Sequence, residues 1–199
     1  MNWLKLTNFE TDKICFMRKP LVIIVILVCG LIACNKPAKG RNGVSYKSAV
    51  QYNDYIVGRQ SKLMQNVLNF TKAAAINLDS AEIMLGKFAG ETAITIEEIK
   101  GMPAYKGDSS LRDAAVRSFS FYKDVFENDY SRIITIRKKG VDMTSEDIEE
   151  MKNIVDKITR DEKVFDKSFH NAQKNFADKN HMKLKENEMQ EKFEKEIDQ

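Results

Sequence analysis

The chain has 199 residues, of which 43% are hydrophobic, and its 32 basic and 29 acidic side chains give a net charge of +3. A balance this close to neutral excludes the strongly basic footprint of a nucleic-acid-binding protein. All three cysteines lie within the first 34 residues, so the rest of the chain can form neither a disulfide nor a cysteine-based metal or nucleophilic site.

The first element along the chain is an apolar run from Leu21 to Cys34, preceded by Arg18 and Lys19. Its 14 residues are too few for a membrane-spanning helix, which needs about 20. A basic start followed by a short apolar run is typical of a secretory signal. A buried core helix is the alternative, but a continuous apolar run lacks the polar face that such a helix turns to water.

The end of this run, Leu31-Ile32-Ala33-Cys34, resembles the lipobox of bacterial lipoproteins. The resemblance implies that the Cys34 thiol carries a diacylglyceryl group and that signal peptidase II cuts after Ala33. It also implies that the lipid anchors the protein in a membrane of the cell envelope. No acidic cluster, which would resemble the surface-export tag of some Bacteroidota lipoproteins, follows Cys34, and this favours a periplasm-facing position.

Residues 1–16 do not fit such a signal, because they place Glu10 and Asp12 ahead of its basic start. Translation from Met17 would give a compact signal, so we expect residues 1–16 to be a misassigned extension, 17–33 the signal peptide, and 34–44 the lipidated cysteine and a polar linker. Losing the four basic and two acidic residues before Cys34 leaves 28 basic and 27 acidic side chains.

Two helices are predicted after the linker. Apolar residues recur at spacings of three, four and seven from Tyr46 to about Ile76, the spacing of one helix face. Asp79, followed three residues later by Glu82, predicts the cap of a second helix that runs to about Lys100. Glycine and proline residues then interrupt the pattern.

Two more helices complete the pattern. The third is capped by Asp108 or Ser110 and ends at a basic pair before Gly140. The fourth opens at Thr144 and shows the clearest periodicity. We interpret this periodicity as heptads that are interrupted at Glu162 and, at the end, at Lys179. One heptad position holds Ile148, Val155, Phe169 and Phe176, and the other holds Met151, Ile158, Phe165 and Ala172.

Long amphipathic helices, short turns and almost no strand signal predict an all-α fold, an up-down four-helix bundle over residues 45–186. Residues 187–199 are expected to form a charged helical or frayed tail. The pattern loosely resembles uncharacterised four-helix envelope lipoproteins of Bacteroidota, a resemblance that implies no particular activity.

Polar residues that interrupt the apolar seams are the candidate site residues. If neighbouring helices are antiparallel, counting residues from each turn shows which residues lie at the same height along the bundle. Six polar residues lie at about one height and form a layer that could bind a ligand or a partner. Its members are Arg59, Gln60, Glu97, Glu98, His170 and Gln173. The alternative is that they cap one end of the bundle and pair at its surface.

A second polar level pairs Tyr122 with Glu162. A carboxyl group that is desolvated beside a phenol would have a raised pKa, as functional carboxyls often do. The alternative is that Glu162 turns its carboxylate to solvent at the edge of the seam.

No metal, cofactor or catalytic set is predicted. His170 and His181 are eleven residues apart on one helix, roughly 16 Å along its axis, which is too far to share one metal ion. We therefore expect a non-enzymatic, membrane-anchored module that serves structurally or binds another envelope protein. A bundle that binds a small molecule through Arg59, Glu97 and His170 is the alternative.

Overall fold

The computed structural model describes residues 4–7 and 38–186, so the predicted lipid attachment at Cys34, the cleavage point and the tail from residue 187 lie outside the described residues. The described helices are α1 (Ala49–Ile76), α2 (Leu78–Lys100), α3 (Ser110–Asp124), α4 (Tyr130–Arg137) and α5 (Ser145–Lys179), with a π-helical turn at Val125–Asp129 and a 3-10 turn at Gly140–Asp142. The strands are β1 (Leu4–Thr7), β2 (Ala38–Lys39), β3 (Ser45–Tyr46) and β4 (Lys183–Glu186).

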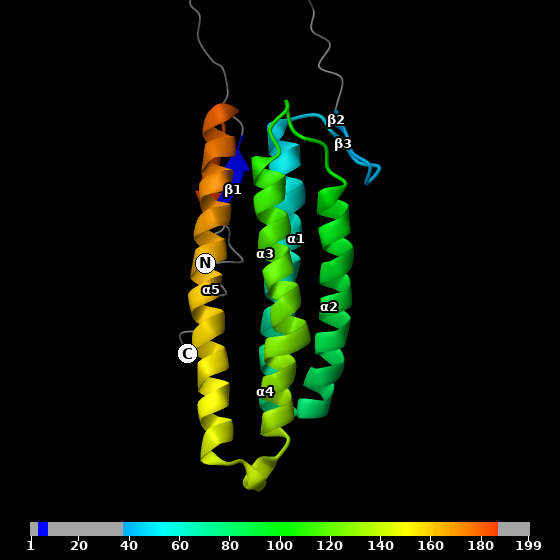
Figure 1. Cartoon of the computed structure of the whole chain (residues 1–199). Helices are drawn as coiled ribbons and strands as arrows, with labels where there is room; N and C mark the ends of the chain where they lie inside the picture. The colour runs from blue at the N-terminus through cyan, green and yellow to red at the C-terminus, as the bar shows by residue number, and fades with distance from the viewer. Residues whose placement is uncertain (1–3, 8–37, 187–199) are drawn as a thin grey trace, which may run out of the picture.

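The described chain is predominantly helical, which confirms the all-α fold class. The helices lie side by side as long rods, with α3 and α4 forming one of them (Figure 1). Their shared core is rich in aromatic side chains, and its largest fully buried members include Tyr52, Phe119, Phe126, Phe169 and Phe176. Within the described residues, no helix is both long enough and apolar enough to cross a membrane.

The turn between α1 and α2 depends on Asn77. Its backbone N–H donates to the carbonyl of Ala73 and ends α1, while its side-chain oxygen accepts from the backbone N–H of Ser80 at 2.8 Å and starts α2. Asp79, the predicted cap, instead lies within the first turn of α2. Asparagine is equally suited to the position, because its short side chain reaches the orphan N–H groups.

The start of α5 follows the prediction closely. Thr144 and Asp147 form a capping box, in which each side chain accepts from the backbone N–H of the other residue. The carboxylate of Asp147 also accepts from the Lys139 ammonium at 2.6 Å. The connection between α4 and α5 is therefore held at both of its ends.

The packing seam of α5 corrects the heptad interpretation. Ile148 and Val155 are 56% and 49% exposed, whereas Ile158 and Phe169 are buried. The residues that face the bundle recur every eleven positions, as Asp147, Ile158 and Phe169, then Met151, Glu162 and Gln173, then Ile154, Phe165 and Phe176. An eleven-residue repeat gives 3.67 residues per turn, close to a straight helix, so the seam does not drift. Glu162 is thus a member of the seam and not an interruption.

Residues 38–46 form a hairpin, where a polar linker to residue 44 was expected. Strands β2 and β3 are antiparallel, and the hairpin docks on the end of α2. A Cβ added at Gly40 would lie 2.7 Å from the carbonyl oxygen of Gly101, so only glycine permits this approach. The part of the linker that the structure describes is therefore a fixed element of the fold.

Beyond α5 the chain leaves the helical path. His181 adopts a positive φ of 55°, and residues 183–186 form β4, which pairs antiparallel with β1. Strand β1 also packs against α1. The helical part of the predicted bundle therefore ends at Lys179 instead of continuing to residue 186.

Candidate functional site

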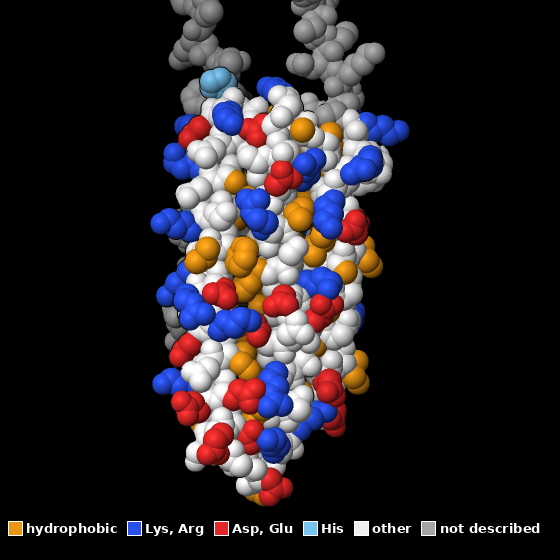
Figure 2. Space-filling model, viewed as in Figure 1, with side chains coloured by type: hydrophobic (Ala, Val, Ile, Leu, Met, Phe, Trp, Pro, Cys, Tyr) orange, Lys and Arg blue, Asp and Glu red, His pale blue; other side chains and the backbone are white. Residues whose placement is uncertain are grey.

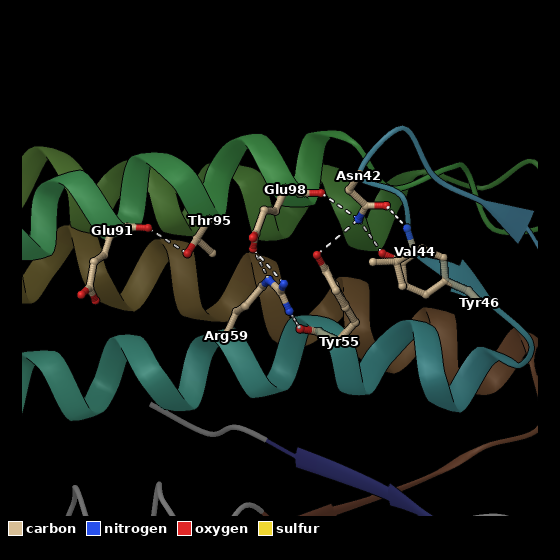
Figure 3. A network of polar contacts seen from close by, with 8 residues as sticks. All are labelled: Asn42, Val44, Tyr46, Tyr55, Arg59, Glu91, Thr95 and Glu98. Atoms are coloured by element: carbon tan, nitrogen blue, oxygen red, sulfur yellow. Dashed lines mark hydrogen bonds and ion pairs between the residues drawn. The ribbon is translucent and has the colours of Figure 1, made fainter.

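The predicted six-residue polar layer separates into two groups on different sides of α1. Arg59 faces α2, where its Nε and Nη2 atoms each lie 2.8 Å from Oε2 of Glu98 (Figure 3). The guanidinium also stacks on the ring of Tyr55, 3.3 Å from its centroid. Both charges of this pair are thus satisfied within the protein.

Asn42 extends this group into the hairpin. Its Nδ2 atom donates to the hydroxyl of Tyr46 at 2.7 Å and to the carbonyl of Glu98 at 3.1 Å, while its Oδ1 accepts from the N–H of Val44 (Figure 3). Burial raises the pKa of Tyr46 to about 12. Asn42 therefore fastens the hairpin to α2, a role that its position in an apparent linker concealed.

Glu97 does not join either group. Its carboxylate pairs with Lys100 at 2.8 Å, one turn along α2, and its side chain is 71% exposed. Exposed pairs of this kind contribute little to stability. The structure therefore places Glu97 at the surface, as the alternative interpretation of the layer expected.

Of the remaining members of the layer, Gln60 lies on α1, and His170 and Gln173 lie on α5. Nε2 of Gln173 donates to Oδ1 of Asn53 at 2.9 Å, and both residues are fully buried. Gln60 is also fully buried, and neither of its amide atoms has a hydrogen-bond partner. Nδ1 of His170 is buried without a partner as well. Unpaired buried polar atoms are rare in native proteins and call for an explanation.

Tyr122 and Glu162 meet as predicted. The Tyr122 hydroxyl donates to Oε1 of Glu162 at 2.5 Å. Tyr122 is almost fully buried and Glu162 is half-buried, so the pair is not open to water on all sides. Burial, reinforced by the charges of Asp166 and Glu162, raises the pKa of Tyr122 well above its ordinary value.

Asp166 follows Glu162 by one turn of α5 and has the most perturbed carboxyl of the group. Its Oδ1 atom is buried with no hydrogen-bond partner. Burial, assisted by the nearby charge of Glu162, raises the pKa of Asp166 to about 7. A carboxyl with this pKa changes its charge near neutral pH, which is uncommon for a purely structural residue.

Contacts between the helices set the level at which these residues meet. Asn53 pairs with Gln173 and Tyr52 stacks on Phe176, so α1 and α5 run antiparallel. Gln60 follows Asn53 by seven residues on α1, and Asp166 precedes Gln173 by seven residues on α5, so Gln60 lies level with Asp166. A spacing of seven residues keeps each pair on one face of its helix.

The third side of this level comes from α3. Tyr122 bonds Glu162, and Asp129 bonds Lys157 further along, so α3 with its continuation is also antiparallel to α5. Ser118 lies one turn before Tyr122, which places it level with Asp166. Its hydroxyl is buried and has no hydrogen-bond partner. We call Gln60, Ser118 and Asp166 the three-helix polar site.

The π-helical turn at Val125–Asp129 directly follows α3, the helix that carries Ser118 and Tyr122. One extra residue in this turn re-aims the side chains that follow it, and such turns often occur near functional sites. After it, Tyr130 stacks on Phe70 of α1, with 4.7 Å between ring centroids. Burial and the charge of Glu162 raise the pKa of Tyr130 to about 12. No feature of the sequence predicted this turn.

Gln60, His170, Tyr122 and Glu162 were predicted from the sequence, whereas Ser118 and Asp166 were not. Asp166 was hidden by the heptad interpretation, although it lies one turn from Glu162 and seven residues from Gln173. Ser118 is a small residue beside the apolar Phe119 and gives no signal by itself. An eleven-residue repeat in α5 places Glu162 and Gln173 in the same seam.

Among residues 4–7 and 38–186, no group of three or more histidine, cysteine, aspartate or glutamate side chains could hold a metal ion. Comparison with protein-family models, curated proteins and solved structures found no match.

Proposed function

We propose that this chain is an envelope lipoprotein, anchored through Cys34, whose up-down helical bundle is a non-enzymatic binding or structural module. The observation that carries the proposal is the sequence from Arg18 to Cys34, with its basic start, apolar run and lipobox-like end. Two or more acyl chains on one cysteine would hold the domain stably, whereas a single chain would not.

The hairpin supports an orientation for the anchored domain. Ala38, the first residue of β2, lies four positions after Cys34, and an extended chain spans at most about 14 Å over that length. The end of the bundle that carries the hairpin, drawn uppermost in Figure 1, is therefore the end held at the membrane. The turn between α4 and α5 projects away from it.

The surface of the bundle supports a binding role for the domain. On the face shown in Figure 2, basic and acidic side chains are interspersed without a large patch of one sign. Large apolar side chains are exposed on α2 and α5, among them Ile83 and Ile94, and Ile148, Val155 and Val164. Ile83 and Ile94 lie on one face of α2, and Ile148 and Val155 lie on one face of α5. Apolar residues exposed together on one helix face favour contacts with another protein.

Metabolic labelling with a palmitate analogue tests the anchor. We expect Cys34→Ser to lose the label and to leave the membrane fraction or accumulate as the uncleaved precursor. Cys29→Ser is the matched control, because it removes a thiol from the same apolar run and should keep the label. Equal labelling of Cys34→Ser and the unaltered protein would contradict the proposal.

Binding of a small molecule inside the bundle is the second candidate function. It is favoured by one observation, the three buried polar side chains of the three-helix polar site whose atoms lack partners. Arg59 and Glu97, which the sequence predicts to bind the molecule together with His170, are each paired elsewhere and are not part of this candidate site. Crosslinking of the anchored protein to envelope proteins, set against ligand-induced thermal shifts, separates the two functions.

A further inference from the structure

The segment that follows Cys34 carries basic but no acidic side chains. Residues 35–53 contain four lysine or arginine residues and no aspartate or glutamate, although the whole chain is nearly balanced, with 32 basic and 29 acidic side chains. The structure describes three of these four cations, namely Lys39 on β2, Arg41 in the turn of the hairpin and Lys47 directly after β3, and all three are exposed. The part of the domain nearest to the proposed anchor therefore presents a local excess of positive charge.

Neighbouring carboxylates do not neutralise these three cations. The carboxylates at the end of α2 and the start of α3 are each engaged by another cation, in pairs that join Glu98 to Arg59 at 2.8 Å, Glu97 to Lys100 at 2.8 Å, Asp108 to Lys179 at 2.6 Å and Asp113 to Arg112 at 2.8 Å. Lys39, Arg41 and Lys47 make no ion pair with these residues, with Asp54 of α1, or with any other residue that the structure describes. Their charge is available to a partner outside the described fold.

The fold holds the basic segment in a fixed position on the bundle. Asn42, next to Arg41, donates to the Tyr46 hydroxyl and to the carbonyl of Glu98, which ties the turn of the hairpin to α2 (Figure 3). The pairing of β2 with β3 orders the strands on either side of this turn. Because the backbone is already ordered, the cations can meet a charged surface without the entropic cost of folding a flexible segment.

The opposite end of the bundle has the reverse charge. Residues 140–151, in the connection from α4 to α5 and the first turns of α5, contain five carboxylates and no lysine or arginine. Figure 1 shows the hairpin and this connection at opposite ends of the bundle. The 28 residues of α1 alone span about 42 Å, several times the Debye length of about 10 Å at ordinary salt. The two charged ends therefore act separately on a nearby surface.

We infer that the hairpin end of the bundle docks on anionic phospholipid headgroups through Lys39, Arg41 and Lys47, which rests on the proposed lipid anchor at Cys34. Lysine and arginine donate charge-assisted hydrogen bonds to phosphate oxygens. A basic segment next to a membrane anchor adds its attraction for anionic lipid to the hold of the acyl chains. The docked hairpin would restrict the domain to one orientation, whereas acyl chains alone leave it free to tumble on its tether.

The position of the anchor favours lipid over an acidic protein as the partner of this surface. Lys39 lies five positions after Cys34, at most about 17 Å along an extended chain. In the anchored protein, the membrane is therefore the surface nearest to these cations. The carboxylates of residues 140–151 would be repelled by anionic lipid, so both ends of the bundle favour the same orientation.

Tryptophan fluorescence from the hairpin tests the inference. The only tryptophan of the chain is Trp3, so the full chain with Trp3→Phe and Ser45→Trp carries a single reporter at an exposed position of β3. It is mixed with vesicles whose lipid headgroups carry a nitroxide, which quenches only at short range. Vesicles of phosphatidylcholine alone are compared with vesicles in which a third of the lipid is phosphatidylglycerol. An unlipidated chain is quenched only if it binds the vesicle, so the measurement applies with or without the acyl chains.

We expect quenching at least about twofold stronger with the anionic vesicles, and we expect about 1 M salt, where the Debye length is about 3 Å, to abolish the difference. Replacing Lys39, Arg41 and Lys47 together with glutamine should also abolish it. The salt dependence is measured on a chain that keeps all three cations, so the test stands even if the triple variant fails to fold. Equal quenching by the two kinds of vesicle would overturn the inference.

A matched triple variant controls for net charge. Lys152, Lys163 and Lys167 are exposed on α5 and form no ion pair with a described residue. Replacing these three lysines with glutamine removes the same net charge and should leave the difference between the two kinds of vesicle intact. Loss of the difference in this variant as well would overturn the inference, because the attraction would then follow net charge instead of the hairpin.

Palmitate labelling, measured in parallel, separates failure of the lipid partner from failure of the anchor. If palmitate labels Cys34 but the two kinds of vesicle quench equally, the anchor stands and the lipid inference is wrong. If the chain carries no label but anionic vesicles alone quench it through the three cations, the docking surface stands and the anchor fails. Equal quenching by both vesicles, together with polyglutamate binding that requires the three cations, would assign the surface to an acidic protein instead.

Discussion

At the scale of single residues, Asp166 shows how position changes the behaviour of an ordinary carboxyl. The side chain is half-buried on a helix seam, opposite an amide and a hydroxyl, with a second carboxyl one turn away. Burial disfavours the charged form, and the charge of Glu162 adds to that effect. The sequence contains many other aspartates, and nothing local to Asp166 distinguishes it from them.

We expect Asp166→Asn to stabilise the protein at pH 8 but not at pH 4. An unfolded aspartate loses its proton near pH 4, whereas the folded protein keeps it until about pH 7. The folded state therefore holds the extra proton between those values, and stability falls as the pH rises through that window. The gain at pH 8 should not exceed about 4 kcal/mol. Urea unfolding of both proteins at the two pH values measures it, and an equal difference at both would contradict the assignment.

Asn42 is the second residue whose role depends on tertiary contacts. Asn42→Ala should destabilise the hairpin by about 1–3 kcal/mol, because the Tyr46 hydroxyl, the Glu98 carbonyl and the Val44 N–H would lose one partner. Hydrogen exchange of the hairpin amides and urea unfolding measure the loss. The exposed Asn153 gives the control substitution, Asn153→Ala, which should change the free energy of unfolding by less than about 0.5 kcal/mol.

At the scale of elements, α5 shows what periodicity can and cannot define. The existence of the helix and its capping box followed from the sequence, because both depend on neighbouring residues. The seam did not, because a seven-residue and an eleven-residue repeat agree over one or two turns and separate only with length. The hairpin was missed for a different reason, since its fixed position depends on contacts of Asn42 with Glu98 and Gly101, far along the chain.

A matched pair of substitutions distinguishes the two seams. Ile158→Ala should cost about 2 kcal/mol or more, because Ile158 is buried. Val155→Ala should cost less than about 1 kcal/mol, because this side chain is half exposed and meets few neighbours. Chemical unfolding gives both values. Similar losses in the two variants would favour the heptad seam.

At the scale of the whole molecule, the all-α class was predictable, whereas the candidate site was only partly so. The number of helices and their approximate bounds follow from local sequence patterns. The partner of a residue on α1 depends instead on the side of the helix that it occupies. Arg59 and Gln60 are adjacent in the chain, yet Arg59 pairs with Glu98 of α2, whereas Gln60 lies two turns along α1 from Asn53, which pairs with Gln173 of α5. Counting residues along antiparallel helices gives only the height of a residue along the bundle, with an error of several residues. It therefore could not show that Arg59 and Gln60 lie on different sides of α1.

The proposed orientation gives a prediction for the anchored protein in vesicles. A fluorophore attached at position 41, in the hairpin, should be quenched by labelled lipid headgroups, because residue 41 lies seven positions from Cys34. A fluorophore at the fully exposed position 141, between α4 and α5, should not be quenched. Stronger quenching at position 141 would reverse the orientation.

The pairing of β1 with β4 has a consequence for the protein after processing. Residues 4–7 precede the proposed cut after Ala33, so the lipidated form would contain β4 but not the strand that pairs with it. The backbone N–H and carbonyl groups of Lys183–Glu186 would then form an open edge, and open edges accept further strands. A chain translated from Met17 would lack β1 from the start, so by either route the anchored protein would present β4 as a position that another extended segment could occupy.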